Sequence, residues 1–369
     1  MKTVCEINKC AGCMLCKDEC PKGAIRILDN IVAYNAVIDQ SVCINCGKCY
    51  RICQVNNPVQ VAKPISWLQG WAKDESIRNT GASGGVATAI EKSFVRQGGI
   101  VYSCAQQKDR FVFKEANKED EITSFSGSKY VKSTPEGIYK EIRAQLNEER
   151  NILFVGLPCQ VAALKNLVGE RENLYTIDLI CHGTPSPLLL SKFLGEAKIE
   201  VSDNTVISFR KGNSFSLSVN GKRISRSKVR DYYTESFLKG LSYTENCYSC
   251  QFAKTERCSD LTLGDSWKSD LPMEEKEKGI SLLLCQTEKG RELIDSSNLF
   301  LTEVDIKKAI EGNGQLQKPM KKTEEREIFI SAMQKGADYS TAIKKCWRKK
   351  YYKDSVKNAL AALGISKFK

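Results

Sequence analysis

Histidine is almost absent from this sequence, since His182 is the only one among 369 residues. A single imidazole excludes zinc sites built on several histidines. It also excludes most Ser-His-Asp and Cys-His hydrolases, unless the whole mechanism depended on that one residue. We interpret His182 as a packed loop residue, and proton donation to a bound cofactor is the alternative.

Long apolar runs and nucleotide-binding fingerprints are also missing. No apolar run approaches the ~20 residues of a membrane-spanning helix. The first five residues, from Met1 to Cys5, lack the apolar core of a signal peptide. No G-x-G-x-x-G occurs, so the dinucleotide-binding fingerprint is absent. We therefore expect a cytoplasmic protein with no membrane span.

Cysteine, in contrast, is abundant, with 17 residues, and eight of them, between Cys10 and Cys53, fall in two runs of the form C-x2-C-x2-C-x3-C. In a cytosolic protein such cysteines indicate metal or redox chemistry rather than disulfides. The paired runs are typical of a two-cluster bacterial ferredoxin, in which the fourth cysteine of each run binds the other cluster. A zinc ribbon and a disulfide knot are the alternatives. We assign Cys10, Cys13, Cys16 and Cys53 to the first 4Fe-4S cluster, and Cys43, Cys46, Cys49 and Cys20 to the second.

The formal net charge of +12 would by itself favour a nucleic-acid partner. That sum, however, treats every cysteine as a neutral thiol. Each oxidised 4Fe-4S cluster with four thiolates carries about −2, so two or three clusters remove roughly 4 to 6 positive charges. The remaining surface is modestly basic, and we expect no nucleic-acid partner.

Four further cysteines have positions or spacing typical of metal ligands. Cys159 and Cys181 each follow a predicted strand, and ligands bind where the strands of an α/β sheet end. Cys247 and Cys250 have the C-x2-C spacing of a thiolate pair. One interpretation is a third 4Fe-4S site, with Cys258 as a spare ligand. The other is that Cys159 and Cys181 are buried packing residues, while the pair binds zinc or nothing. We interpret the remaining cysteines as structural: Cys5, Cys104, Cys285 and Cys346.

Strands alternate with helices in the middle of the chain. Buried-strand runs occupy residues 100–104, 151–155 and 175–180, and helical patterns lie between them. This alternation predicts an α/β core with partly parallel strand pairing. Before it, the glycine-rich stretch 81–85 leads into a helix, and the free N–H groups of such a helix start suit a phosphate. Tight backbone packing is the alternative interpretation of these glycines.

Six motifs in a fixed order carry a family resemblance. They are Gly81-Ala-Ser-Gly-Gly85, Ser128-Lys-Tyr-Val131, Gly156-Leu-Pro-Cys-Gln160, Cys181-His-Gly183, Cys247-x2-Cys250 and Asp260-Leu-Thr-Leu-Gly-Asp-Ser-Trp267. From about Cys10 to the region of Arg326, the chain resembles the coenzyme F420 hydrogenase/dehydrogenase beta-subunit family, preceded by a two-cluster ferredoxin domain.

This resemblance implies an iron-sulfur flavoprotein oxidoreductase. Members bind FAD and 4Fe-4S clusters and move electrons between the clusters and a substrate at the flavin, and many bacterial members lie near polysaccharide-synthesis genes. The resemblance favours the third-cluster interpretation, and it implies a role for Lys129 at a phosphate or at the flavin ring. It places flavin contacts at Ser83, Gly84, Gly85, Ser128 and Lys129, and Lys129 and His182 are the candidate catalytic residues.

The expected partners are a soluble ferredoxin or a reduced coenzyme, together with a small-molecule substrate, and the chain is expected to act as a homo-oligomer or as one component of a redox complex. Two alternatives belong to other functional classes. One is an electron-transfer subunit without a substrate of its own, and the other is a zinc-binding scaffold protein.

The predicted fold class is α+β: a ferredoxin-like domain, an α/β flavin-binding domain of the F420 hydrogenase beta-subunit type and a helical C-terminal tail. We interpret the basic patch at residues 344–350 as a solvated helix face, with docking to an acidic partner or an anionic membrane surface as the alternative. The expected boundaries are 1–56 for the ferredoxin domain, 57–75 for a linker, 76–170 and 171–335 for the two parts of the flavin-binding domain, and 336–369 for the tail.

Overall fold

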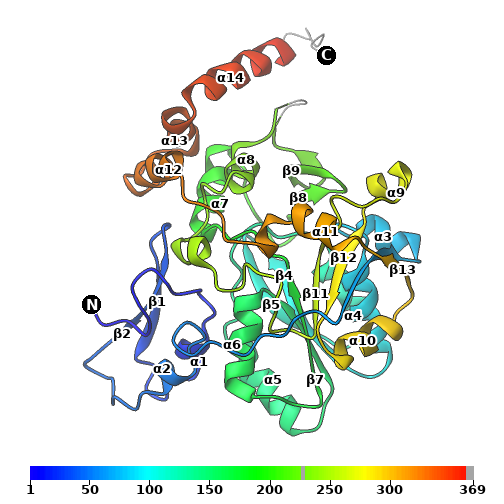
Figure 1. Cartoon of the computed structure of the whole chain (residues 1–369). Helices are drawn as coiled ribbons and strands as arrows, with labels where there is room; N and C mark the ends of the chain where they lie inside the picture. The colour runs from blue at the N-terminus through cyan, green and yellow to red at the C-terminus, as the bar shows by residue number, and fades with distance from the viewer. Residues whose placement is uncertain (226–228, 363–369) are drawn as a thin grey trace.

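The computed structural model describes residues 1–225 and 229–362. Figure 1 shows a small N-terminal module, a central body built around one large sheet, and a helical arm near the C-terminus. Among the described residues, no helix combines the length and the apolar composition that crossing a bilayer requires.

The N-terminal module contains an antiparallel hairpin of β1 (Ile25–Asp29) and β2 (Tyr34–Ile38). Two one-turn helices, α1 (Leu15–Asp18) and α2 (Lys48–Arg51), follow the two cysteine loops. The residue before each helix has a left-handed backbone, with φ of 63° at Met14 and 71° at Gly47. The two loops, which carry the same cysteine spacing, therefore turn in the same way.

The central sheet has eight strands in the order β13-β3-β12-β11-β7-β6-β4-β5. β4, β6, β7 and β11 pair in parallel, and the outer strands pair antiparallel, so the predicted α/β core with partly parallel pairing is confirmed. The strands are β3 (Ser66–Ala72), β4 (Ile100–Gln107), β5 (Arg110–Ala116), β6 (Ile152–Gly156), β7 (Leu174–Leu179), β11 (Leu261–Asp265), β12 (Ser281–Cys285) and β13 (Leu299–Glu303).

Helices cover both faces of this sheet (Figure 1). The side chains of β6 alternate: Leu153 and Val155 belong to the core that includes α4 and α10, whereas Ile152 and Phe154 belong to the core that includes α5 and α6. This alternation is the two-residue period of a strand buried on both faces. The covering helices are α4 (Val86–Arg96), α5 (Ile138–Asn147), α6 (Pro158–Val168) and α10 (Glu288–Asp295).

A second, three-stranded sheet and the C-terminal arm share a separate core. Phe209, Tyr233, Phe329 and Tyr339 are buried together there, so the first two arm helices pack against the body. The predicted helical tail is confirmed over the described residues. These elements are α7 (Pro187–Glu196), β8 (Ile207–Lys211), β9 (Ser214–Val219), β10 (Lys222–Arg223), α8 (Tyr232–Leu238), α12 (Glu324–Gln334), α13 (Tyr339–Cys346) and α14 (Arg348–Ala362). Shorter helices complete the fold: α3 (Glu75–Thr80), η1 (Glu121–Phe125), η2 (Glu245–Ser249), α9 (Met273–Lys278), α11 (Ile306–Gly312) and η3 (Gly314–Leu316).

Two of the expected boundaries differ from the observed elements. The segment 57–75, expected to be a linker, contains β3, which pairs with both β12 and β13 inside the large sheet. The prolines that favoured a linker stand at positions 58 and 64, before the strand, so their effect ends where β3 begins. The boundary at residue 170 lies between β6 and β7, which are neighbours in the same sheet.

Candidate functional site

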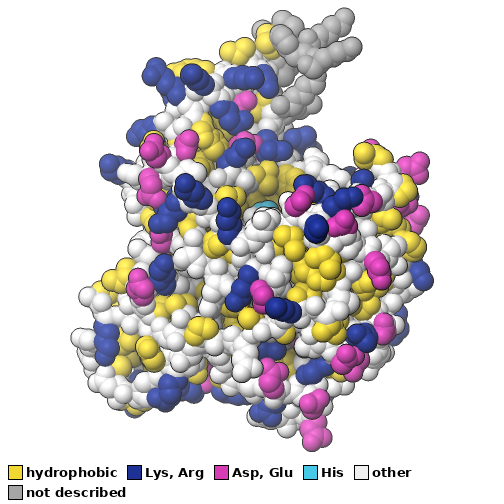
Figure 2. Space-filling model, viewed as in Figure 1, with side chains coloured by type: hydrophobic (Ala, Val, Ile, Leu, Met, Phe, Trp, Pro, Cys, Tyr) yellow, Lys and Arg dark blue, Asp and Glu magenta, His cyan; other side chains and the backbone are white. Residues whose placement is uncertain are grey.

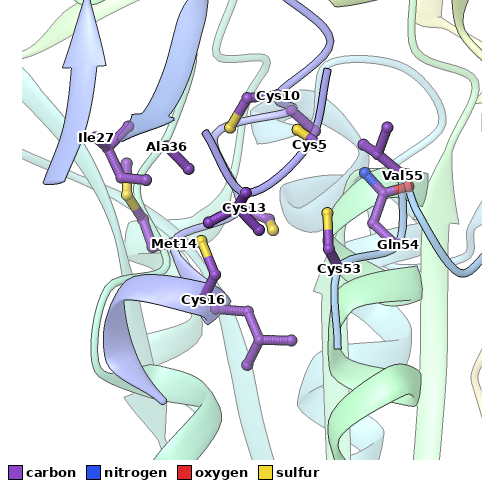
Figure 3. A pocket seen from close by; sticks show the side chains of 13 residues that line it. Cys5, Cys10, Cys13, Met14, Cys16, Ile27, Ala36, Cys53, Gln54 and Val55 are labelled. Atoms are coloured by element: carbon purple, nitrogen blue, oxygen red, sulfur yellow. The ribbon is translucent and has the colours of Figure 1, made fainter. Parts of the chain in front are cut away.

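Two cysteine-lined cavities lie in the N-terminal module. Figure 3 shows the first, where side chains from separate stretches of the chain point toward a common space. The second lies beside it, around α2. Each cavity takes three cysteines from one run and the fourth from the other run. The first is lined by Cys10, Cys13, Cys16 and Cys53, and the second by Cys20, Cys43, Cys46 and Cys49.

Backbone N–H groups point at several of these sulfurs. Gly12 N–H donates to Cys10 Sγ at 3.4 Å, Ala24 N–H to Cys20 Sγ at 3.3 Å, and Asn45 N–H to Cys43 Sγ at 3.4 Å. Such donors stabilise thiolates, which are the form that binds iron. The donor set therefore fits 4Fe-4S clusters in both cavities.

Cys5, which the sequence suggested to be structural, also lines the first cavity (Figure 3). Its thiol lies beside two of the predicted ligands. A hydrogen bond from Cys5 lowers the pKa of Cys53 to about 6, and the same thiol contributes most to lowering the pKa of Cys10. Cys5 stands outside both C-x2-C-x2-C-x3-C runs, so spacing gave no sign of this position.

The four cysteines proposed for a third cluster converge at the carboxyl ends of neighbouring parallel strands. Cys181 follows β7, and Cys159 opens α6 directly after β6. The pKa of Cys181 is raised by burial and then by the negative charges of Cys247, Cys159 and Cys250. Cys247 Sγ also lies 3.6 Å from Thr244 Oγ1. Among residues 1–225 and 229–362, no three His, Cys, Asp or Glu side chains are arranged to hold one metal ion; a 4Fe-4S cluster is a different kind of site, because each of its four thiolates binds a different iron.

The N-terminal module packs directly against this third group of cysteines. Lys9 Nζ donates to Ser249 Oγ at 2.9 Å, so a neighbour of Cys10 contacts a neighbour of Cys250. On the other side, Gln251 Nε2 donates to Gln54 Oε1 at 2.7 Å, which joins the residues that follow Cys250 and Cys53. The first cluster cavity and the third cysteine group are therefore adjacent.

Lys132 lies between these two groups, and the sequence reasoning missed it. Its side chain is buried, and Nζ donates to the carbonyl of Ala11 in the first cluster loop at 3.1 Å. Nζ also lies 5.1 Å from the ring centroid of Tyr34. The Lys132 charge lowers the pKa of Cys10 and opposes the rise, caused by burial, that takes the pKa of Cys159 to about 12.

The loop that carries Cys247 and Cys250 is fixed to β7 by a buried ion pair. The Arg257 guanidinium donates to Asp178 Oδ1 at 3.0 Å and 3.2 Å, to the carbonyl of Phe252 at 2.6 Å and to that of Leu179 at 2.8 Å. The exposed side-chain fractions are 2% for Arg257 and 0% for Asp178. Cys258, the spare candidate, is buried next to this pair and donates to the carbonyl of Pro158 at 3.5 Å.

The glycine-rich stretch before α4 is tightly packed. Ser83 Oγ donates to the carbonyl of Ile280 at 2.8 Å, and Gly84 N–H donates to Ser281 Oγ at 3.0 Å. A Cβ at position 84 would lie 2.5 Å from the carbonyl oxygen of Gly70. Gly85 has φ of 75°, and a Cβ there would lie 2.8 Å from the carbonyl oxygen of Ile77. Close backbone approach therefore accounts for both glycines. The first N–H groups of α4, which have no partner within the helix, come directly after them in the chain.

The second predicted flavin segment lies beside that helix start. Thr88 Oγ1 in the first turn of α4 is 3.2 Å from Ser126 Oγ, in the loop that leads to Ser128. The Lys129 ammonium donates to the carbonyls of Phe125, Ser126 and Gly127, so it organises its own loop. Its pKa is lowered by burial, and the pKa of the nearby buried Glu91 is raised to about 7 by burial.

His182 lies next to Cys181 and near a second buried ion pair, between Arg210 and Asp265. Arg210 donates to both oxygens of Asp265 at 2.8 Å. The guanidinium lies 5.0 Å from the ring centroid of Trp267. The side chain of His182, cyan in Figure 2, is exposed, so it is not the packed loop residue that the sequence suggested. Protein atoms around the ring lower its pKa, and Asp265 opposes that shift. Sequence reasoning missed Arg210, because nothing local to β8 connects it to β11.

Several known proteins and protein families are similar to parts of this chain. Residues 9–57 match the model of a 4Fe-4S dicluster domain. The beta subunit of the F420-dependent formate dehydrogenase of Methanocaldococcus jannaschii is 24% identical over 236 residues, which cover 61% of this chain and 58% of that protein. One component of the ion-translocating oxidoreductase complex of Methanosarcina acetivorans is 47% identical over 53 residues, which cover 14% of this chain and 18% of that protein. The chain thus spans less than two thirds of either relative.

One solved structure is also similar. A chain of the F420-reducing [NiFe] hydrogenase complex of Methanosarcina barkeri aligns with 70% of this chain and 91% of its own length, at 15% identity and a TM-score of 0.47. Two further models, the N-terminal and C-terminal parts of the coenzyme F420 hydrogenase/dehydrogenase beta subunit, match residues 67–136 and 149–308. With more than half of its residues matched by these two parts, the chain belongs to the coenzyme F420 hydrogenase/dehydrogenase beta-subunit family and carries a 4Fe-4S dicluster domain at its N-terminal end.

Proposed function

We propose that this protein is an iron-sulfur flavoprotein oxidoreductase that exchanges electrons between three 4Fe-4S clusters and a small-molecule substrate at FAD. One observation carries this proposal: the first cluster loop contacts the third cysteine group directly, and the two flavin segments contact each other. The contacts of Lys9 with Ser249 and of Gln251 with Gln54 join the first cluster loop to the third group. A flavin converts one-electron transfers into a two-electron reaction.

The chain's own residues have distinct parts in this proposal. The twelve cysteines hold the clusters, and the convergence of Cys159, Cys181, Cys247 and Cys250 supports the third. For FAD, the first N–H groups of α4 offer a site for a phosphate, next to Ser83, Gly84 and Gly85. The bond of Thr88 to Ser126 supports a site that also includes Ser128. Lys129 shapes that loop, and His182 remains the candidate proton donor or acceptor.

The substrate class follows from the relatives alone. The formate dehydrogenase of Methanocaldococcus jannaschii is named as F420-dependent, so a deazaflavin is the first substrate to test. A role in polysaccharide synthesis and a cytoplasmic location remain predictions of the sequence. A soluble ferredoxin or a reduced coenzyme is the proposed electron partner.

Anaerobic purification followed by iron, sulfide and flavin analysis tests the proposal. We expect about twelve irons, twelve sulfides and one FAD per chain, because each cluster holds four of each. If the purified protein held about eight irons per chain and no flavin, only the function of an electron carrier would remain supported. A colourless protein with bound zinc would instead support the zinc-binding scaffold function and contradict the proposal.

An electron-transfer subunit is the second candidate, and the comparisons favour it specifically. The matching family is named for the beta subunits of a hydrogenase and a dehydrogenase, and the formate dehydrogenase relative is itself one component of a larger enzyme. Two results together would support this candidate. The protein with its cofactors bound would reduce no acceptor by itself, including coenzyme F420, and it would gain activity when a copurified partner is added. Turnover by the isolated chain would exclude it.

Lys132 provides a prediction about the electron path. Replacing Lys132 by methionine removes a buried positive charge between the first and third clusters, so adding an electron to either becomes less favourable. We expect the ratio of reduced to oxidised first cluster, at a fixed potential, to fall about tenfold, which corresponds to about 59 mV for one electron. An anaerobic redox titration followed by electron paramagnetic resonance measures it.

Three controls separate charge from packing at Lys132. Lys132→Arg keeps the charge and is expected to keep the potential. Lys289→Met removes a lysine that lies 5.7 Å from the ring centroid of Tyr175, away from the clusters, and is expected to leave all potentials unchanged. The second cluster serves as an internal reference. Unchanged potentials in Lys132→Met would contradict this role.

A further inference from the structure

The two cluster cavities differ in their exposure to solvent. Around the first, Cys10 and Cys16 are buried, with exposed fractions of 7% each. Around the second, Cys46 is exposed, and Cys43 and Cys49 are partly exposed. An electron donor in solution therefore approaches the second cluster more closely than the first. The first cavity contacts the third cysteine group. The second cluster therefore lies at the outer end of the proposed series of three clusters.

The surface around the second cavity combines exposed apolar and basic side chains. Val42, Ile44 and Tyr50 have exposed fractions of 47%, 57% and 58%. Figure 2 shows hydrophobic and basic side chains side by side on the N-terminal module. We define the second-cluster face by these three residues, Cys46 and the basic residues Lys2, Lys22, Lys48 and Arg51.

The basic residues lie at the rim of the cavity. Lys22 and Lys48 line it, Lys2 Nζ donates to Asn45 Oδ1 at 3.2 Å, and Arg51 Nη1 donates to the carbonyl of Cys46 at 3.1 Å. Of two acidic groups nearby, Glu19 is neutralised by ion pairs, whereas Asp39 is an exposed carboxylate. Glu19, with an exposed side-chain fraction of 2%, binds Lys48 and Arg143, and the Asp39 carboxylate accepts hydrogen bonds from Ser41.

From this arrangement we propose that the second-cluster face docks an acidic one-electron redox protein. The inference rests on the proposed function, in which the second cluster exchanges electrons with the outside. In the docked pair, the reduced donor loses one electron and the oxidised second cluster gains it, with no bond made or broken. Transient electron-transfer interfaces are small, and complementary charge raises their association rate. An apolar centre with a basic rim has the chemistry that such a partner requires.

Stopped-flow reduction of the loaded protein by a reduced acidic 2[4Fe-4S] ferredoxin tests the proposal. We expect the second-order rate constant to fall as salt rises. In the double variant Lys2→Glu/Lys22→Glu, it is expected to fall at least tenfold at low salt and to lose most of its salt dependence. The double variant Lys335→Glu/Lys353→Glu makes the same charge change on the exposed surface of the C-terminal arm and is expected to react like the unchanged protein.

An unchanged rate in Lys2→Glu/Lys22→Glu would overturn the docking proposal. If that variant also lost binding to anionic phospholipid vesicles, the face would be assigned to a membrane surface. Reduction by dithionite and the iron content are measured on the same samples. Normal loading with an unaffected ferredoxin rate rejects the docking site alone, whereas missing clusters in the unchanged protein reject the proposed function.

Discussion

Replacing Arg257 by methionine is expected to lower the free energy of unfolding by about 3–5 kcal/mol, because removing one partner of a buried ion pair leaves the other charge uncompensated. Asp178 is fully buried, and Arg257 also satisfies the carbonyls of Phe252 and Leu179. Denaturant unfolding followed by circular dichroism, under anaerobic conditions, measures the change.

The decrease in the free energy of unfolding caused by Arg257→Met is also expected to depend on pH. Burial already raises the pKa of Asp178, and the Arg257 charge opposes that rise. Without Arg257, the folded-state pKa of Asp178 moves further above its unfolded value. A group of this kind favours folding below the unfolded pKa and loses that contribution as the pH rises through the folded pKa. The difference in stability between Arg257→Met and the unchanged protein should therefore be larger at pH 8 than at pH 5.

A matched control comes from the surface. Arg291 lies 3.6 Å from Glu288, and their exposed side-chain fractions are 52% and 74%. Exposed pairs contribute little, so Arg291→Met is expected to cost less than about 1 kcal/mol. Replacing both buried partners, as Arg257→Met with Asp178→Leu, should recover much of the loss, because no isolated charge remains. Equal effects of Arg257→Met and Arg291→Met would contradict the importance of the buried pair.

Local patterns in the sequence predicted the cluster loops and the main strands and helices. Most of the site features that the sequence did not predict are contacts between residues far apart in the chain. The cysteine runs and the alternation of strands with helices depend on spacings of a few residues, and both were visible. Arg257 bonds to Asp178 across 79 residues, Lys132 to Ala11 across 121, and Arg210 to Asp265 across 55. No residue near any of these three in the sequence indicates its partner, so such buried contacts of charged side chains become visible only once the fold is known.

The glycines of the stretch 81–85 show a different limit. The sequence left both phosphate binding and tight packing open, and packing is evident at Gly84 and Gly85, where a Cβ would meet backbone atoms of β3 and α3. Packing and binding do not exclude each other here. The same close approach brings the start of α4 against the sheet and beside the loop of Ser126.

Among the proposed variants, the one that removes the third cluster is expected to cause the largest change in iron and sulfide content. In the double variant Cys247→Ser/Cys250→Ser, two of four thiolates become hydroxyls, which bind iron weakly, so we expect a loss of about four irons and four sulfides per chain. The signals of the two N-terminal clusters should remain, because their eight ligands lie in a module with its own core.

Iron and sulfide assays, with electron paramagnetic resonance of the reduced protein, measure this loss. Cys346→Ser is the matched control, since Cys346 ends α13 in the C-terminal arm, and its iron content should not change. Zinc is assayed in the same samples, because a pair that binds zinc would lose zinc while keeping all its iron. Unchanged iron in Cys247→Ser/Cys250→Ser would show that these two thiols hold no cluster. The electron path would then have to run directly from the first cluster to the flavin site.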